Sequence, residues 1–180
     1  NTTGDYNNAY GAFTLSANTT GHYNTGIGYA VLNQNTTANM NTGVGYNALY
    51  ANTTGANNTA VGTNALDANT TGTNNTVVGY NSGTSITTAV NNTVVGMQAL
   101  KLTTTGNNNV AFGLNAVLYN TTGANNTGLG TYALINNTTA SNNTAVGYNS
   151  LAANTTGTRN VAVGDLALDA NTTGSSNTGI

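Results

Sequence analysis

Residues 52–68 read N-T-T-G-A-N-N-T-A-V-G-T-N-A-L-D-A, and the whole chain repeats this unit. The tetrapeptide N-T-T-G, or a near variant, begins every 17 residues from Asn1 to Asn171, without insertion or deletion. Ten full units and one partial unit of ten residues account for all 180 positions. A fixed period of this kind is typical of solenoids. We therefore interpret residues 1–180 as a single array, expect it to be a segment of a longer fibre, and number positions within the unit from its first Asn.

Several positions of the unit hardly vary. Position 11 is Gly in all ten units that contain it, and position 15 is Leu in eight of ten. Position 10 is always large and apolar, from Tyr10 to Ile180. Position 7 is Asn in every unit: Asn7, Asn24, Asn41, Asn58, Asn75, Asn92, Asn109, Asn126, Asn143, Asn160 and Asn177.

A parallel β-solenoid with one unit per coil is the architecture that fits this pattern. Gly, Asn and Thr are poor helix formers, and two-helix repeats need about 33 residues or more. An antiparallel meander is disfavoured because the chain contains no Asn-Gly pair, the strongest short hairpin signal. In a parallel coil, equivalent residues stack about 4.8 Å apart. The sequence therefore predicts an all-β rod on the order of 50 Å long.

The pattern also predicts which side chains face inward. We expect positions 8 and 10 to fill the interior of the main strand, with Val110 and Val161 supporting that parity, and position 15 to fill the interior of a second strand. Of the adjacent threonines at positions 2 and 3, one should face in and the other out, because strand side chains alternate. Asn at position 7 should form a ladder from coil to coil. Gly at position 11 should adopt positive φ or a tight corner.

Composition excludes several classes of function. Charged residues make up 3% of the chain, with Lys101 and Arg159 as the only basic ones. Two cations are too few for a nucleic-acid binder, and no apolar run reaches the roughly 18 residues of a membrane span. The chain has no Cys and one His, His22, and its nearest approach to a carboxylate pair is Asp165 and Asp169. We therefore expect no metal, no cofactor and no enzymatic activity.

Two segments show a family resemblance. NVAVGDLAL (residues 160–168) and NVAFGLNAV (residues 109–117) resemble the S-V-A-I-G-x-x-A repeats in the YadA-like heads of trimeric autotransporter adhesins. The full unit is similar to repeat arrays of bacterial surface proteins and phage tail-fibre-like proteins. The resemblance implies a left-handed parallel β-roll, a homotrimer, and a role as an adhesive head or fibre shaft. The adhesin unit is shorter, at about 14 residues, so a single-chain solenoid or another filament packing stays open.

The functional hypothesis is an extracellular structural or adhesive fibre segment on a cell surface, in a matrix filament or on a virion. Its expected partners are further copies of itself, as a homotrimer or in end-to-end or lateral assembly. The alternative is a ligand-binding solenoid that recognises glycans or, less favoured, ice, for which adjacent threonines lack the Thr-x-Thr spacing. A stripe of tyrosines at position 12 is the candidate glycan contact, with corner packing as the competing interpretation: Tyr29, Tyr46, Tyr80 and Tyr148.

Overall fold

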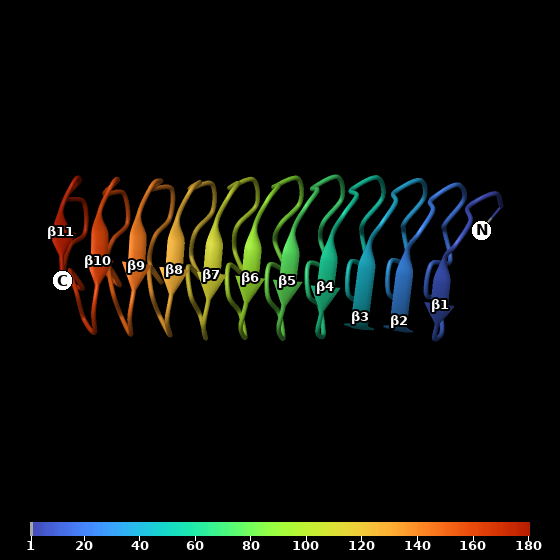
Figure 1. Cartoon of the computed structure of the whole chain (residues 1–180), viewed down its shortest axis with the longest axis horizontal. Coiled ribbons are helices and arrows are strands. Elements are labelled where there is room, and N and C mark those ends of the chain that lie inside the picture. The colour runs from blue at the N-terminus through green and yellow to red at the C-terminus, as the bar shows by residue number, and fades with distance from the viewer. Residues whose placement is uncertain (1) are drawn as a thin grey trace.

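The computed structural model describes residues 2–180 as one parallel β-solenoid (Figure 1). Eleven strands form a single sheet in chain order, and each pairs in parallel with the strand one unit away. The register shifts by one 17-residue unit at every step, as in Thr76↔Thr93. The strands are β1 (Asn8–Tyr10), β2 (Thr25–Tyr29), β3 (Thr42–Tyr46), β4 (Thr59–Val61), β5 (Thr76–Val78), β6 (Thr93–Val95), β7 (Val110–Phe112), β8 (Thr127–Leu129), β9 (Thr144–Val146), β10 (Val161–Val163) and β11 (Thr178–Gly179). The predicted β-solenoid with one unit per coil is confirmed.

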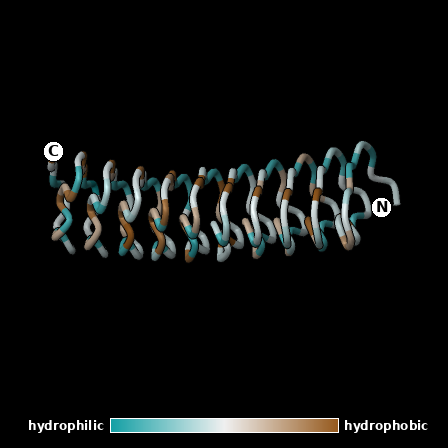
Figure 2. Tube along the Cα trace, turned by 90° about the horizontal axis from the view of Figure 1, so that it is seen from below, coloured by the Kyte–Doolittle hydropathy of each residue, from teal (hydrophilic) through white to brown (hydrophobic). Residues whose placement is uncertain are grey.

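The apolar part of the interior holds up to three side chains per coil, contributed by positions 9, 14 and 15. In the coil that contains β4 these are Ala60, Ala65 and Leu66, all fully buried. Leu at position 15 is buried throughout the central coils, as expected. Figure 2 shows the apolar segments recurring once per coil along the rod. The core is therefore a thin column shared by all coils, and no coil buries enough surface to be stable alone.

The predicted parity of the main strand is wrong. Position 9, not positions 8 and 10, faces inward: Val77 is fully buried, whereas Phe112 at position 10 is 54% exposed. The interior is too narrow for a larger inward row, because a Cβ on Gly43 would already lie 2.4 Å from Cγ1 of Val31. Each position-9 glycine lies against a branched side chain of the preceding turn region: Thr14 at Gly26, Val31 at Gly43, Val117 at Gly128 and Leu168 at Gly179. Val110 and Val161 at position 8 consequently lie on the outer surface.

The predicted second strand is also absent, although the residue at position 15 faces inward. Positions 12 to 17 form turns, and positions 13 and 15 both have φ near +50 to +60°, as in Asn64 (52°) and Leu66 (55°). The turns still bond from coil to coil, since the N–H of Leu49 donates to the carbonyl of Ala65 at 3.1 Å. Asn tolerates this left-handed region well, whereas Leu occupies it at an energetic cost. Burial of the Leu side chain offsets that cost.

The threonine pair behaves differently from the expectation. Neither residue faces the interior, because this segment is a bend and not a strand. At position 2 the hydroxyl donates to the carbonyl of the next coil, as from Thr53 to Thr70 at 3.0 Å. At position 3 the side chain is exposed, as in Thr54. The buried neighbours of the pair are Asn at position 1 and Gly or Ala at position 4.

Glycine at position 11 is required by the backbone. Gly62 has φ of 135°, and a Cβ there would lie 2.4 Å from the carbonyl oxygen of Gly79. The corner after each strand therefore has positive φ and no space for a side chain. This agrees with the role expected of the glycine.

Candidate functional site

Buried asparagines tie the coils together from inside. At each of the ten steps between position-7 residues, the backbone N–H of one Asn donates to the Oδ1 atom of the preceding Asn at 2.9–3.0 Å. The Nδ2 atom donates to the position-4 carbonyl of the following coil, as from Asn58 to Gly72 at 2.8 Å. The Oδ1 atom of each Asn thus takes the place of a backbone carbonyl as the acceptor, one residue before the strand begins. This ladder holds the coils in register, and it leaves no group free to act on a ligand.

A second buried ladder, at position 1, was not anticipated. The Nδ2 atom of Asn52 donates to Oδ1 of Asn35 at 3.0 Å and to the carbonyl of Gly55 at 2.9 Å. The ladder is interrupted at Ile86 and Thr103. Oδ1 of Asn69 consequently finds no hydrogen-bond donor among the described residues. The repeated N-T-T-G sequence was the available signal, because Asn at position 1 recurs almost as regularly as at position 7.

The outer side of the sheet, which we call the sheet face, consists of the side chains at positions 8 and 10 of β1–β11. Position 8 is Thr in eight strands, and position 10 is Val, Ile, Leu, Phe or Tyr in every unit. Ile27 is 44% exposed and Leu129 is 36% exposed. No residue of the sheet face is Asp, Glu, Lys, Arg or His. Its threonines lie beside apolar side chains, so the spacing is Thr-x-apolar and not Thr-x-Thr.

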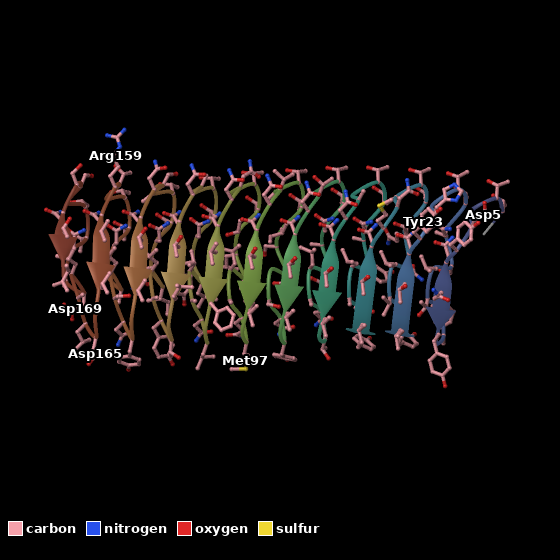
Figure 3. All side chains as sticks on the ribbon, viewed as in Figure 1. Asp5, Tyr23, Met97, Arg159, Asp165 and Asp169 are labelled. Atoms are coloured by element: carbon pink, nitrogen blue, oxygen red, sulfur yellow. The ribbon has the colours of Figure 1, made fainter. Side chains whose placement is uncertain are left out.

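The predicted tyrosine stripe at position 12 is only partly continuous. Tyr29 and Tyr46 stack with their ring centroids 5.3 Å apart and their planes 6° from parallel. Tyr80 lies between Thr63 and Met97 in the same column, and Tyr148 makes an edge contact, at 6.0 Å, with Tyr132 of the preceding coil. Figure 3 shows Met97 and Asp165 of this column projecting from the corner beyond the strand ends. The four tyrosines therefore share a corner, but only Tyr29 and Tyr46 form a joint surface.

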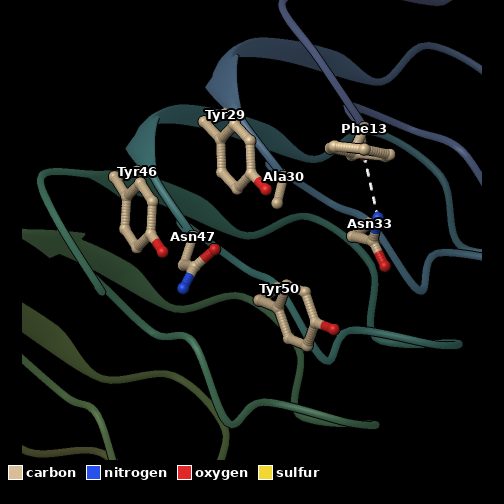
Figure 4. Close-up of a pocket in the computed structure, with 7 residues that line it drawn as sticks. All are labelled: Phe13, Tyr29, Ala30, Asn33, Tyr46, Asn47 and Tyr50. Carbon is tan, nitrogen blue, oxygen red and sulfur yellow. Dashed lines mark hydrogen bonds between the residues drawn. The ribbon is translucent and has the colours of Figure 1, made fainter.

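A cleft opens beside this tyrosine pair. Its lining, which we call the aromatic cleft, encloses about 380 Å³ and comes from positions 12, 13 and 16 of the first three coils: Phe13, Tyr29, Ala30, Asn33, Tyr46, Asn47 and Tyr50 (Figure 4). Phe13 meets Tyr29 edge-on with centroids 5.5 Å apart. Sequence reasoning found Tyr29 and Tyr46 but missed the other residues. The signal for them was the short side chain of Ala30 in a column where five of the ten residues are Asn.

A shallower groove crosses a third side of the rod. It is lined by residues of positions 17 and 2: Leu102, Tyr119, Thr121, Asn136, Thr138, Ala153 and Thr155. The threonine hydroxyls in it donate to backbone carbonyls, as from Thr121 to Thr138 at 3.0 Å. Those donors are already used within the fold. This groove offers mainly apolar surface and little polar recognition.

Carboxylate and imidazole groups come together at one place in residues 2–180, where Nδ1 of His22 lies 3.8 Å from Oδ2 of Asp5. No group of three or more His, Asp, Glu or Cys side chains that could hold a metal occurs in this part of the chain. Nδ1 of His22 accepts a hydrogen bond from the backbone N–H of Asp5 at 2.9 Å, so the imidazole is tied to its neighbouring coil. Asp165 and Asp169 lie at different positions of one coil (Figure 3). Across the same residues, no helix has the length and apolarity needed to cross a bilayer.

Comparison with known proteins adds no relative. No protein-family model, no curated protein and no solved structure matches this chain.

Proposed function

We propose that this chain is a segment of an extracellular structural or adhesive fibre, on a cell surface, in a matrix filament or on a virion, and that it associates with further copies through its sheet face. The observation that carries the proposal is the row of outward apolar side chains at position 10. These side chains recur at every coil, from Tyr10 through Val78 to Ile180. A continuous row of outward apolar side chains along a whole face is typical of a surface that contacts a partner.

The size of the sheet face supports this interpretation. Eleven strands spaced about 4.8 Å apart, with two outward columns, give a strip of roughly 50 Å by 10 Å, or about 500 Å². The largest apolar patch on a soluble monomer is typically about 300–600 Å² and is often functional, and the strip is of this size. A standard interface buries about 800 Å² per partner. The flanking row at position 6, where Tyr6, Tyr23 and Met40 are all exposed, supplies additional area at the first coils.

The chemistry of the sheet face favours a second copy as the partner. The face carries no charged side chain, so two copies can approach without electrostatic repulsion or desolvation of ions. Its columns have the same repeat in every copy, which allows Thr and Val rows to interdigitate along the full length. A homotrimer is the arrangement that the adhesin resemblance implies. Lateral pairing and end-to-end stacking are the other arrangements. In the test below the mass separates a trimer from a dimer, and the sheet-face variant separates lateral from end-to-end association.

The decisive experiment is sedimentation of the rod with charge placed on one face at a time. Val61→Asp with Val95→Asp puts two carboxylates on the sheet face. The matched control, Thr54→Asp with Thr88→Asp, puts the same charge on exposed position-3 residues. We expect the unmodified chain and the control to sediment as oligomers and the sheet-face variant as a monomer with unchanged circular dichroism. A monomeric unmodified chain, or an oligomer that persists in the sheet-face variant, would contradict the proposal.

Recognition of a ligand is the second candidate, and one observation favours it. The aromatic cleft combines exposed aromatic rings with the side-chain amide of Asn47, for which the structure shows no hydrogen bond within residues 2–180. An adhesive fibre needs at least one such place.

A further inference from the structure

The aromatic cleft exists because one column of side chains is interrupted. At position 13 the column contains Phe13, Ala30 and Asn47 in the first three coils, and Asn, Gln, Tyr or Leu in all later ones. Ala30 is the smallest residue in that column and is only 4% exposed. Two coils further on the column is filled, with Nδ2 of Asn64 donating to Oδ1 of Asn81 at 3.0 Å. Because Ala30 has only a methyl group, a space remains between the side chains of Phe13 and Asn47, and Ala30 forms the floor of that space.

The walls of the cleft are held in place by contacts within the rod. Asn33 uses its amide nitrogen twice, donating to the carbonyl of Phe13 at 2.9 Å and to Oγ of Ser16 at 2.8 Å. The backbone N–H of Asn47 donates to the carbonyl of Tyr29 at 3.0 Å, and that of Tyr50 donates to the carbonyl of Asn47 at 3.2 Å. The parallel stack of Tyr29 and Tyr46 fixes both rings. The site is therefore formed before any ligand arrives, which reduces the entropy lost on binding.

Polar groups of the cleft point inward and have free hydrogen-bonding capacity. Figure 4 shows the hydroxyls of Tyr29 and Tyr46 directed the same way, towards Ala30 and Asn47, with the ring of Tyr50 facing them from the next column. Within the described residues, the side-chain amide of Asn47 makes no hydrogen bond. It supplies both a donor and an acceptor. Oδ1 of Asn33 adds a further acceptor, since its Nδ2 atom is already used.

From this geometry we infer that the aromatic cleft binds a neutral saccharide. None of its seven lining residues carries a charge at neutral pH, so it offers no counter-charge for a phosphate, a carboxylate or an amine. Exposed rings of Phe13 (62%) and Tyr50 (36%) suit the C–H faces of a sugar ring, and the phenol and amide groups suit its hydroxyls. The volume of about 380 Å³ lies at the small end of ligand pockets, which span about 300–1,000 Å³. A mono- or disaccharide unit, free or at the end of a glycan, fits this description.

This inference deepens the adhesive part of the proposed function, but it uses residues of a different face. The cleft belongs to positions 12, 13 and 16, whereas self-association uses positions 8 and 10. Loss of sugar binding should therefore leave the oligomeric mass unchanged, and loss of self-association should leave the cleft intact. The two proposals can fail separately.

The test is a glycan array of neutral and acidic oligosaccharides, followed by titration calorimetry with the neutral disaccharides lactose, maltose and N,N′-diacetylchitobiose. Ala30→Asn fills the floor of the cleft with the side chain that most other coils have there. Because Ala30 has φ of 52°, a region that Asn adopts readily, this variant should fold at least as well as the parent chain. Tyr46→Ala removes one wall. Tyr80→Ala is the matched control, since it removes a position-12 tyrosine that does not line the cleft.

We expect reproducible binding of at least one neutral glycan, weakened at least about tenfold by Ala30→Asn and by Tyr46→Ala, which corresponds to about 1.4 kcal/mol, and unchanged in Tyr80→Ala. The sedimentation mass of Ala30→Asn should equal that of the parent chain. Absence of any neutral glycan among the hits overturns the inference. So does binding that Ala30→Asn leaves intact, or binding that Tyr80→Ala reduces equally, because the corner tyrosines in general and not the cleft would then be responsible.

Discussion

Ile86 occupies the space that the missing side chain of Gly83 leaves in the core. A Cβ atom on Gly83 would lie 3.1 Å from Cδ1 of Ile86, and both residues are fully buried in the same turn region. Gly83 replaces the usual Leu at position 15, and Ile86 replaces the usual Asn at position 1 of the next unit. The two departures from the repeat compensate each other in volume, at the expense of an unpaired Oδ1 atom on Asn69.

This compensation predicts strong coupling between the two sites. Gly83→Leu alone should destabilise the rod because Leu overlaps Ile86, and Ile86→Asn alone should destabilise it because a void remains beside Gly83. The double variant places Leu at position 15 of this coil and returns a donor to Oδ1 of Asn69, so it should be as stable as the parent or more so. We expect a coupling free energy of about 1–3 kcal/mol. Chemical denaturation of the four proteins measures it, and strictly additive effects would show that the two residues do not share the space.

Val77 and Val78 are neighbours in β5, but an Asp substitution should destabilise the fold at the first and not at the second. Val77 is fully buried, so Val77→Asp places a carboxylate in the core and should cost about 3–5 kcal/mol or prevent folding. Val78 lies on the sheet face, so Val78→Asp should leave the coil folded and act on self-association alone. Thermal melting of both variants at low protein concentration tests this pair. Equal destabilisation by the two substitutions would be incompatible with the parity seen here.

The position-7 ladder should contribute strongly to stability at each coil. Oδ1 of Asn58 accepts from the backbone N–H of Asn75 at 3.0 Å, and its Nδ2 atom donates to Gly72. Asn58→Ala leaves the buried N–H of Asn75 without an acceptor, and we expect a loss of about 2–4 kcal/mol. The control is Asn57→Gly, because Asn57 is exposed and has φ of 60°, which Gly adopts freely. Urea unfolding should separate the two variants clearly, and a similar loss in both would assign no special role to the ladder.

Asp67 should make the stability of the rod depend on pH. Burial raises the pKa of the Asp67 carboxyl above its usual value of 3.8, and backbone hydrogen bonds at Asp67 and Ala68 offset this only in part. The folded state therefore takes up a proton at a higher pH than the unfolded state does. Stability from this group is greatest below the unfolded pKa and decreases as the pH rises through the folded pKa. Asp67→Asn should raise the melting temperature at pH 7 and change it less at pH 3, and a larger gain at pH 3 would contradict the direction of the shift.

The repeat was sufficient to predict the architecture. A fixed unit with Gly at every corner and Asn at every position 7 is compatible with few folds other than stacked coils. It was not sufficient to predict parity. Alternation alone allows either position 9 or positions 8 and 10 to face inward. Hydrophobicity favoured the larger apolar residues of position 10, such as Val78, over the smaller residues of position 9, such as Ala60. The volume of the interior decides this, and it depends on how closely the position-14 side chain approaches the strand, as Val31 and Gly43 show.

The candidate site was predictable only in part, for a related reason. A column of tyrosines can be read from spacing, so Tyr29 and Tyr46 were identified. The cleft beside them depends on an absence, the short side chain of Ala30, in a column whose role became clear only from the positive φ shared by Ala30 and Asn47. A short side chain in one column can be recognised as a cleft only when the positions of the neighbouring columns are known.

Each coil of this rod is bonded only to the coil before it and the coil after it. A pull on the two ends therefore reaches every layer with the same force, and the weakest layer opens first. One opened layer releases 17 residues, which extend to about 55–60 Å, while the remaining layers keep their structure. A rod made of such layers is therefore expected to lengthen under load in steps of one layer at a time.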